Sequence, residues 1–310
     1  ENPGKLASAA VIAKSFTDSI TEQISARVAS GKKKPRLVGI LATPSPPSIA
    51  YAESTKRACE AVGMEFDIWR TWDQKDDVED LIIAANADES VDGIMVYFPV
   101  FGGRQDTYLS QIMKPSKDVE GLSFSFAWNL YHNVRWIAPS QLVKGILPCT
   151  PLAIVKCLEA MSVYDRSLPY GDRLRGKTIT VINRSEVVGR PLAALLANDG
   201  ARVFSVDLDA IQEFSKRGGL NQSDNDELDR QASGEVDLQT CLKASSVVIS
   251  GVPSPNFKIN TEWINEGSVC VNFSSAKNFE KDVRSRASLY LPSVGKMTCC
   301  MLQRNLLRLV

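Results

Sequence analysis

Histidine is almost absent from this 310-residue chain, which contains only His132. With a single imidazole, a histidine-rich metal site and a Ser-His-Asp triad have little to draw on, because both need histidine as ligand or base. The seven cysteines are odd in number and form no CxxC pair. They are typical of reduced, mostly buried thiols, and they predict neither a disulfide framework nor a zinc site. The residue types therefore predict no metal site.

Net charge and long apolar runs are also lacking. The 36 basic and 36 acidic residues balance, so nothing predicts a nucleic acid partner or binding to an anionic membrane surface. No apolar run approaches the roughly 20 residues that a membrane-spanning helix needs. The composition is that of an ordinary globular protein, and the length exceeds that of a usual single core. Two domains are therefore the default expectation.

Strand and helix patterns alternate in the first half of the chain, which predicts a parallel sheet. The predicted strands are 36–42, 65–70 and 91–100, and the predicted helices are 6–30, 49–63 and 76–87. The sequence "PCTP" at 148–151 then marks a change. Thr150 is expected to cap a helix that begins at Pro151. A domain boundary is predicted at this point.

A second alternating block follows, with strands predicted at 177–182, 201–207, 245–252 and 268–274, a helix at 188–198, and a polar surface insertion at 215–237. Residues 176–207 read as strand, turn, helix and strand, with Asp207 at the end. In a dinucleotide fold, such a turn and helix N-terminus hold the pyrophosphate, and the acidic residue binds the ribose hydroxyls.

Only Gly189 remains of the usual G-x-G-x-x-G, so the motif alone leaves a purely structural strand–helix unit as an equal alternative. Asp207, 18 residues after Gly189, favours a nucleotide site. Its carboxylate repels a 2′-phosphate and accepts from a 2′-hydroxyl, which predicts NAD and not NADP.

Six motifs stand in the order and approximate spacing found in methylenetetrahydrofolate dehydrogenase/cyclohydrolases: "YAESTKRACEAVG", "DGIMVYFP", "KDVEGL", "LPCTP", "NRSEVVGRPLA" and "PSVGKMT". The chain resembles this family over nearly its whole length, and most closely its monofunctional, NAD-dependent fungal members. The resemblance implies NAD-dependent oxidation of 5,10-methylenetetrahydrofolate to 5,10-methenyltetrahydrofolate in one-carbon metabolism. It also implies a cytoplasmic homodimer that uses no metal.

The departures from the family pattern concern hydrolysis. The family's first motif places a lysine, which serves the cyclohydrolase step, four residues after a tyrosine. Here Tyr51 matches the tyrosine and Thr55 takes the lysine's place. Lys56 is rotated a further 100° around the helix and faces elsewhere. Tyr97 replaces the family's glutamine. Tyr51 and Thr55 are therefore expected at a catalytic site that has lost hydrolysis, because a neutral hydroxyl is no base near pH 7.

The resemblance implies the remaining site residues. Those expected to bind the folate are Tyr51, Tyr97, Phe98, Pro99, Asp118, Glu120, Pro292, Val294, Gly295 and Lys296. Those expected to bind NAD are Asn183, Arg184, Ser185, Val188, Gly189, Asp207, Leu208, Gly251, Val252, Pro253, Ser274 and Ser275. Of the two carboxylates, Glu120 is the one expected to bind the pterin N–H groups. Cys149 is expected to be structural, since no basic activator is near it in sequence.

The predicted fold is α/β, with two domains flanking a cleft. Residues 1–149 form a folate-binding domain completed by a C-terminal helix at 297–310, and residues 150–296 form a Rossmann-type NAD domain. Two alternatives stay open: another two-domain NAD enzyme of the amino-acid or shikimate dehydrogenase type, and a catalytically inactive folate- or nucleotide-binding regulator. The first would leave "KDVEG" and "PSVGKMT" unexplained. The second would bind ligand without producing NADH.

Overall fold

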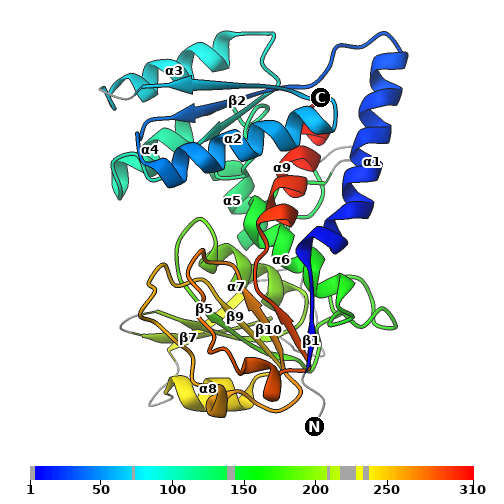
Figure 1. Ribbon diagram of the computed structural model, residues 1–310, viewed down its shortest axis with the longest axis vertical. Helices are drawn as coiled ribbons and strands as arrows, with labels where there is room; N and C mark the ends of the chain where they lie inside the picture. Colours follow the sequence, from blue (N-terminus) through cyan, green and yellow to red (C-terminus); the bar gives the residue numbers. More distant parts are fainter. Residues whose placement is uncertain (1–3, 72–73, 138–143, 208–209, 217–227, 233–236) are drawn as a thin grey trace. The chain divides into compact units, whose positions relative to one another are not determined.

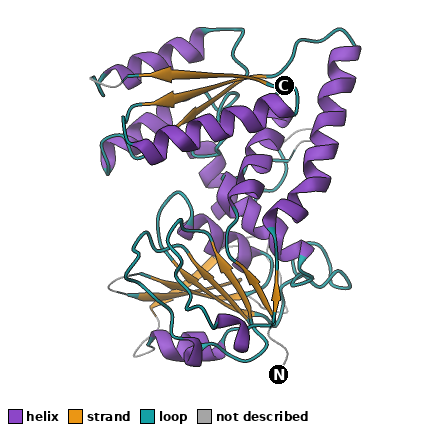
Figure 2. Cartoon of the chain, viewed as in Figure 1, coloured by secondary structure: helices purple, strands orange, loops and turns teal. Residues whose placement is uncertain are grey.

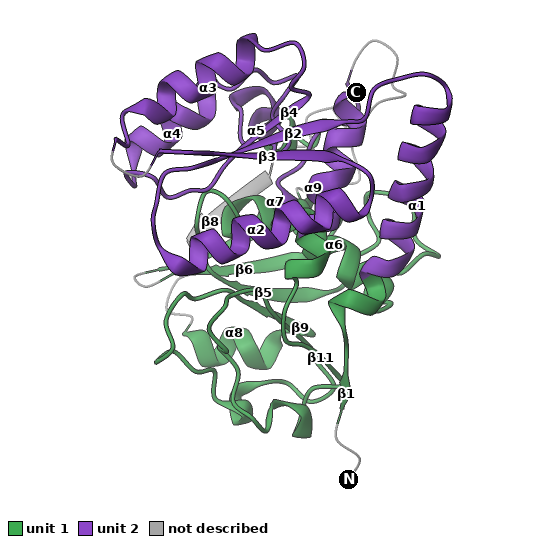
Figure 3. Ribbon diagram, turned by 45° about the horizontal axis from the view of Figure 1, so that its top comes forward, with its two compact units in different colours: residues 1–12, 129–134, 150–298 green, residues 13–128, 135–149, 299–310 purple. Residues whose placement is uncertain are grey.

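The computed structural model describes residues 4–71, 74–137, 144–207, 210–216, 228–232 and 237–310. Contacts within the chain divide it into two compact units, green and purple in Figure 3. Unit 1 contains residues 1–12, 129–134 and 150–298, and unit 2 contains residues 13–128, 135–149 and 299–310. Both units combine strands with helices (Figure 2), which confirms the predicted α/β class.

Unit 2 is built on a parallel three-stranded sheet in the order β3-β2-β4, whose middle strand β2 is labelled in Figure 1 and whose three strands are labelled in Figure 3. The strands are β2 (Arg36–Leu41), β3 (Glu65–Arg70) and β4 (Gly93–Val96). The helices of this half of the chain are α1 (Ala9–Ala29), α2 (Pro46–Ala61), α3 (Asp77–Ala87), α4 (Arg104–Ile112) and α5 (Phe124–Tyr131). The strand and helix positions agree with the sequence prediction to within a few residues, and α4 and α5 are additions to it.

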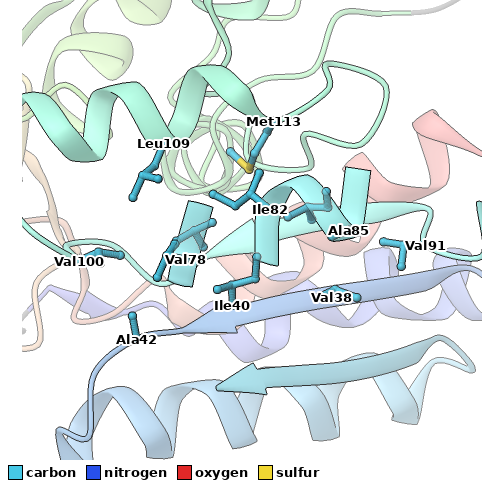
Figure 4. Packing of buried hydrophobic residues seen from close by; sticks show 12 residues of the cluster. Val38, Ile40, Ala42, Val78, Ile82, Ala85, Val91, Val100, Leu109 and Met113 are labelled. Carbon is cyan, nitrogen blue, oxygen red and sulfur yellow. The ribbon is translucent and has the colours of Figure 1, made fainter. Parts of the chain in front are cut away.

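One core cluster lies between this sheet and helices α3 and α4 (Figure 4). Val38, Ile40 and Ala42 alternate along β2 and its end, so their side chains share one face of the strand. Val78, Ile82 and Ala85 recur at helical spacing along α3 and pack against that face. Burial of one such large aliphatic side chain contributes about 1.5–3 kcal/mol. This packing holds the carboxyl ends of β2 and β4 in place.

Helix α2 begins at Pro46, three residues earlier than predicted. The Ser45 side chain accepts a hydrogen bond from the Ser48 amide, and proline at the first helical positions presets the helical φ. The last three residues of the "TPSPPS" segment at 43–48, which precede the predicted helix, form its first turn. Tyr51 and Thr55 consequently lie well inside α2, one turn apart.

Unit 1 is built on an eight-stranded sheet in the order β1-β11-β10-β9-β5-β6-β7-β8. Its strands are β1 (Lys5–Leu6), β5 (Thr178–Ile182), β6 (Arg202–Val206), β7 (Ile211–Lys216), β8 (Leu228–Ala232), β9 (Val247–Ser250), β10 (Val269–Asn272) and β11 (Leu289–Leu291). The remaining helices of the chain are α6 (Cys149–Ala160), α7 (Gly189–Asn198), α8 (Leu238–Ala244) and α9 (Gly295–Leu309), with short 3-10 turns at Thr261–Trp263 and Val283–Ser285.

The sheet is parallel from β1 to β6, but β7 and β8 pair antiparallel at its edge. The predicted polar insertion at 215–237 therefore begins inside β7, contains β8 and ends at Asp237, which caps α8. Its residues 217–227 and 233–236 lie outside the described part. Strand β7 was missed because "IQEFSK" has one fully buried side chain, Phe214, among polar neighbours. A strand with so little apolar surface resembles a loop in sequence.

The first residues were assigned to the wrong half of the chain. Lys5 and Leu6 pair in parallel with Leu289 and Tyr290 of β11, so residues 1–12 are grouped with unit 1. A two-residue strand leaves no readable period in the sequence. Helix α6 begins at Cys149, so Thr150 lies in its first turn and is not its cap. Helix α9 begins at Gly295, two residues before the predicted start.

Helices of the length and apolarity needed to cross a membrane are absent from the described residues.

Candidate functional site

Helix α2 presents Tyr51 and Thr55 differently. Tyr51 is 47% exposed, whereas Thr55 is 3% exposed. The Thr55 hydroxyl donates to the Tyr51 carbonyl at 2.9 Å, four residues earlier. The Lys56 ammonium lies 3.8 Å from the Glu60 carboxylate, on the adjoining face of the helix. The position one turn after Tyr51 therefore holds a hydroxyl already bound to the backbone, and the neighbouring lysine is directed toward another partner.

Tyr97 follows β4 and packs against Tyr51. Their ring centroids lie 5.8 Å apart with the rings perpendicular, an edge-to-face contact. Tyr97 is 7% exposed, and its hydroxyl has no hydrogen-bond partner among the described residues. Removal from water raises the pKa of the Tyr97 hydroxyl and that of the more exposed Tyr51 hydroxyl. Both hydroxyls are neutral near pH 7, so they supply hydrogen bonds and not charge.

Asp118 and Glu120 lie in the loop after α4 and have different partners. Asp118 is fully buried, and its carboxylate accepts from the amides of Glu120 at 3.1 Å, Gly121 at 2.8 Å and Ser123 at 2.7 Å. These bonds oppose the effect of burial, which raises the pKa of Asp118. Asp118 thus shapes the loop.

Glu120 is partly buried and retains an unused acceptor. Its Oε2 accepts from the Val96 amide at 3.2 Å, and its Oε1 bonds no described residue. Burial, and secondly the charge of Asp118, raise the pKa of Glu120 to about 8. At pH 7 this carboxyl is mostly protonated. Hydrogen-bond donors on a ligand would favour the ionised form.

Cys149 lies beneath this loop and is held by α9. Its thiol is 3.4 Å from the Val119 carbonyl, and the Asn305 amide nitrogen donates to the carbonyls of Val119 and Leu147 at 2.9 Å each. Burial raises the pKa of the Cys149 thiol, which suppresses the thiolate. This geometry agrees with a structural thiol. Asn305 was missed because a single asparagine on an amphipathic helix carries no signal in sequence.

The other residues expected at the folate lie in two places. Phe98 and Pro99 follow Tyr97 directly, Phe98 partly buried against the core cluster and Pro99 exposed. Pro292 and Val294 lie in unit 1 between β11 and α9, where the Val294 carbonyl accepts from the first free amides of α9. Gly295 and Lys296 open that helix and are exposed.

The residues expected at NAD gather at the carboxyl ends of the strands in unit 1. Strand β5 lies between β6 and β9, so the connections from it run in opposite directions, and ligands of open α/β sheets bind at such a point. Asn183 occupies the end of β5. Its side chain donates to the Gly251 carbonyl at 3.0 Å and accepts from the Ser185 amide at 3.0 Å. Asn183 thereby joins the loops after β5 and β9.

Gly189 and Ser185 explain how the turn survives without its usual glycines. A Cβ on Gly189 would lie 1.9 Å from the Asn183 carbonyl oxygen, so only glycine fits where α7 passes the end of β5. The Ser185 hydroxyl accepts from the amides of Val188 at 3.2 Å and Gly189 at 3.4 Å. A side chain thus caps the helix start. Asp207 follows β6 directly, as predicted, and Leu208 lies outside the described residues.

A buried amide network supports the loops after β9 and β10, which carry Gly251, Val252, Pro253, Ser274 and Ser275. Asn278 is fully buried, accepts from the Ser250 hydroxyl at 3.0 Å and the Val252 amide at 2.9 Å, and donates to the Val252 carbonyl. Asn272 is also fully buried and accepts from the Asn278 amide at 3.1 Å. Sequence reasoning missed both residues, because nothing in one sequence separates a buried asparagine from a loop asparagine.

Within the described part of the chain, no three His, Cys, Asp or Glu side chains are grouped so that they could hold a metal ion.

Comparisons with known proteins agree with this geometry. Residues 8–120 match the catalytic domain of the tetrahydrofolate dehydrogenase/cyclohydrolase family, and residues 148–217 match its NAD(P)-binding domain. The chain is 49% identical over 309 residues to the methylenetetrahydrofolate dehydrogenase [NAD(+)] of Saccharomyces cerevisiae, covering 99% of this chain and 96% of that protein. It is 46% identical to the Schizosaccharomyces pombe protein of the same name, covering 96% and 92%.

A solved structure shows the same similarity. The NAD-dependent 5,10-methylenetetrahydrofolate dehydrogenase from Saccharomyces cerevisiae aligns with a TM-score of 0.92 at 48% identity, covering 99% of this chain and 97% of that one. The sequence motifs, both domain matches and the near full-length similarity indicate the same family. The chain therefore belongs to the tetrahydrofolate dehydrogenase/cyclohydrolase family.

Proposed function

We propose that this chain oxidises 5,10-methylenetetrahydrofolate to 5,10-methenyltetrahydrofolate with NAD, and that it has no cyclohydrolase activity. The dehydrogenase half is supported by relatives of that name, 49% and 46% identical over nearly the whole chain. The proposed absence of cyclohydrolase activity rests on one observation. Thr55 occupies the position at which the family pattern has a lysine, and its hydroxyl donates to the backbone of its own helix.

The nucleotide-binding residues fit NAD. NAD, when bound, supplies the hydride acceptor. The Asn183 side chain and Gly189 set the turn between β5 and α7 so that backbone can approach a pyrophosphate. Asp207, at the end of β6, accepts hydrogen bonds from the adenosine ribose hydroxyls and repels a 2′-phosphate. This arrangement favours NAD over NADP.

Three residues of unit 2 hold the folate. The exposed Tyr51 ring, set by Tyr97, offers an apolar face, and Glu120 offers Oε1 to the pterin N–H groups. Removal of a hydride from the bridging methylene leaves a cation that its own two nitrogens stabilise. This step needs alignment and no side-chain base.

Folate binding is coupled to ionisation of Glu120. Because N–H donors favour the carboxylate, binding releases a proton wherever free Glu120 is protonated, below its pKa of about 8. The KM for the folate should fall as pH rises toward 8 and then level off.

Hydrolysis of the methenyl product makes a different demand. A water must be activated and protons moved, which a positioned side chain typically accelerates about 10²–10⁴-fold. The Thr55 side chain has no basic nitrogen, and the Lys56 ammonium pairs with the Glu60 carboxylate. The product should therefore leave unhydrolysed.

Steady-state assays with NAD and NADP in parallel test the dehydrogenase assignment. The expected result is NADH formation that depends on methylenetetrahydrofolate, with a much lower kcat/KM for NADP. A protein that bound NAD or the folate but formed no NADH would be the inactive regulator that the sequence left open.

The family resemblance also supports a homodimer in the cytoplasm, and both belong to this proposal. Light scattering after size-exclusion chromatography should give about twice the 34.0 kDa mass of the chain. A tagged full-length protein imaged in cells should be found in the cytoplasm.

A further inference from the structure

Arg184 lies next to Asp207 and is already engaged by backbone. Its Nη2 donates to the Ser205 carbonyl at 2.6 Å and to the Ala210 carbonyl at 2.7 Å. Its Nε lies 3.3 Å from the Ser205 hydroxyl. These two residues bracket Asp207 in the chain, one in the last part of β6 and the other just before β7.

The Ala210 carbonyl connects Arg184 to Asp207 directly. This oxygen accepts from the Asp207 amide at 3.0 Å as well as from Arg184. The Asn183 backbone amide also donates to the Val206 carbonyl at 3.1 Å. The backbone beside Arg184 is therefore bonded to the residue that precedes Asp207. Loss of the Arg184 side chain would remove a hydrogen bond from the backbone on each side of Asp207.

We propose that Arg184 is a positioning residue for coenzyme selection: it clamps the backbone on both sides of Asp207 and so aims that carboxylate at the adenosine ribose. This inference rests on the proposed function. The opposite charges of the two side chains reinforce the clamp, since the Arg184 guanidinium and the Asp207 carboxylate attract each other. Two carbonyl oxygens fix the planar guanidinium more firmly than a lysine ammonium could be fixed.

A rival role predicts a different result. The guanidinium has five N–H donors, and the hydrogen bonds above use only part of them. If the others bound the pyrophosphate, Arg184 would act on phosphate and not through Asp207. The two roles separate when the ribose hydroxyl is removed from a ligand that keeps its phosphates.

The experiment measures binding of ADP and of 2′-deoxy-ADP by calorimetry, without catalysis. For the unaltered protein, loss of the 2′-hydroxyl should weaken binding about tenfold, as expected for one hydrogen bond to a charged group. Asp207→Ala should reduce this ratio to about one. Arg184→Gln should also reduce it to about one, and the double variant should change it no further. A tenfold ratio retained in Arg184→Gln, with both ligands weakened equally, would overturn the proposal.

Two further variants keep the test decisive. Arg202→Ala removes an arginine of the same hairpin, whose guanidinium binds the Glu213 carboxylate at 2.8 and 2.9 Å at the other end of β6. It should leave the ratio at tenfold, and a collapse there would overturn a role specific to Arg184. If Arg184→Gln does not fold, Arg184→Lys decides by the same ratio, with a clear fall expected. Failure of the proposed reaction would appear as absent NADH formation, which these binding measurements do not depend on.

Discussion

The two candidate sites treat their polar groups in opposite ways. In unit 1, the side chains of Asn183, Asn278 and Arg184 form hydrogen bonds with backbone groups around them. In unit 2, the buried Tyr97 hydroxyl has no partner among the described residues, and Glu120 keeps one free oxygen at a raised pKa. Satisfied groups fix a backbone, whereas unsatisfied buried groups cost free energy that a ligand can recover. The nucleotide site is therefore prebuilt, because its side chains already fix the backbone around them. The folate site keeps polar groups that a bound ligand would satisfy.

Asn278→Ala should give the largest effect. It removes the partner of the Ser250 hydroxyl at the end of β9 and of the Val252 amide and carbonyl in the loop after it, and should lower the free energy of unfolding by about 2–4 kcal/mol. Denaturant unfolding followed by circular dichroism measures it. Asn260→Ala is the matched control, because that side chain only caps a short 3-10 turn through the Glu262 amide, and about 0.5–1 kcal/mol is expected. Equal losses would contradict the prebuilt network.

Glu120→Gln should give the next effect, with opposite signs in function and stability. One oxygen facing the folate becomes a donor, so kcat/KM for the folate should fall by the equivalent of about 1–3 kcal/mol. The folded pKa of Glu120, about 8, exceeds its ordinary 4.5, so the stability from its protonated form is complete below pH 4.5 and lost as pH rises through 8.

The same variant should therefore unfold at a higher temperature than the unaltered chain at pH 9, while the two differ little at pH 4.5. Melting curves at the two pH values check this. An unchanged kcat/KM would move the role to Asp118 or out of this loop.

Tyr97→Phe should have a smaller effect and compares the two units directly. The hydroxyl has no described partner in the free chain, so its loss should leave the free energy of unfolding unchanged or raise it by up to about 1 kcal/mol. The KM for the folate should rise about 3–10-fold, the equivalent of one hydrogen bond. Tyr164→Phe is the control from unit 1: that hydroxyl donates to Asp199 at 2.9 Å, and its loss should cost about 1 kcal/mol. Matching stability losses would remove the contrast.

Thr55→Val should give the smallest effect. The side chain keeps its shape and loses the bond to the Tyr51 carbonyl, an oxygen that also accepts within the helix backbone. Dehydrogenase kcat/KM should stay within about twofold, and stability within about 0.5 kcal/mol. A loss above tenfold in steady-state assays would show that the hydroxyl takes part in hydride transfer.

Elements with a strong hydrophobic period could be predicted from the sequence. Very short strands, and residues that act through partners distant in the chain, could not. β2 and β5 were found because their apolar runs are buried on both faces, and Asp207 was placed correctly because it directly follows such a strand, β6. The two residues of β1 and the strand β7 carry too little apolar surface to show a period.

The candidate sites divide in the same way. Tyr51, Thr55 and Glu120 could be named from motifs, since the motif letters stand at fixed spacing. The division of labour between Asp118 and Glu120 could not, because it depends on which backbone amides surround each carboxylate. Asn278 and Asn305 act through partners 26 or more residues away in the chain. Local patterns hold no record of such contacts.

The most direct test of the account is the hydrolysis of purified 5,10-methenyltetrahydrofolate by the unaltered protein, followed by absorbance. Thr55 offers no base one turn after Tyr51, so the methenyl compound should be hydrolysed at the uncatalysed rate at enzyme concentrations that give full dehydrogenase turnover. Hydrolysis well above the uncatalysed rate would contradict it.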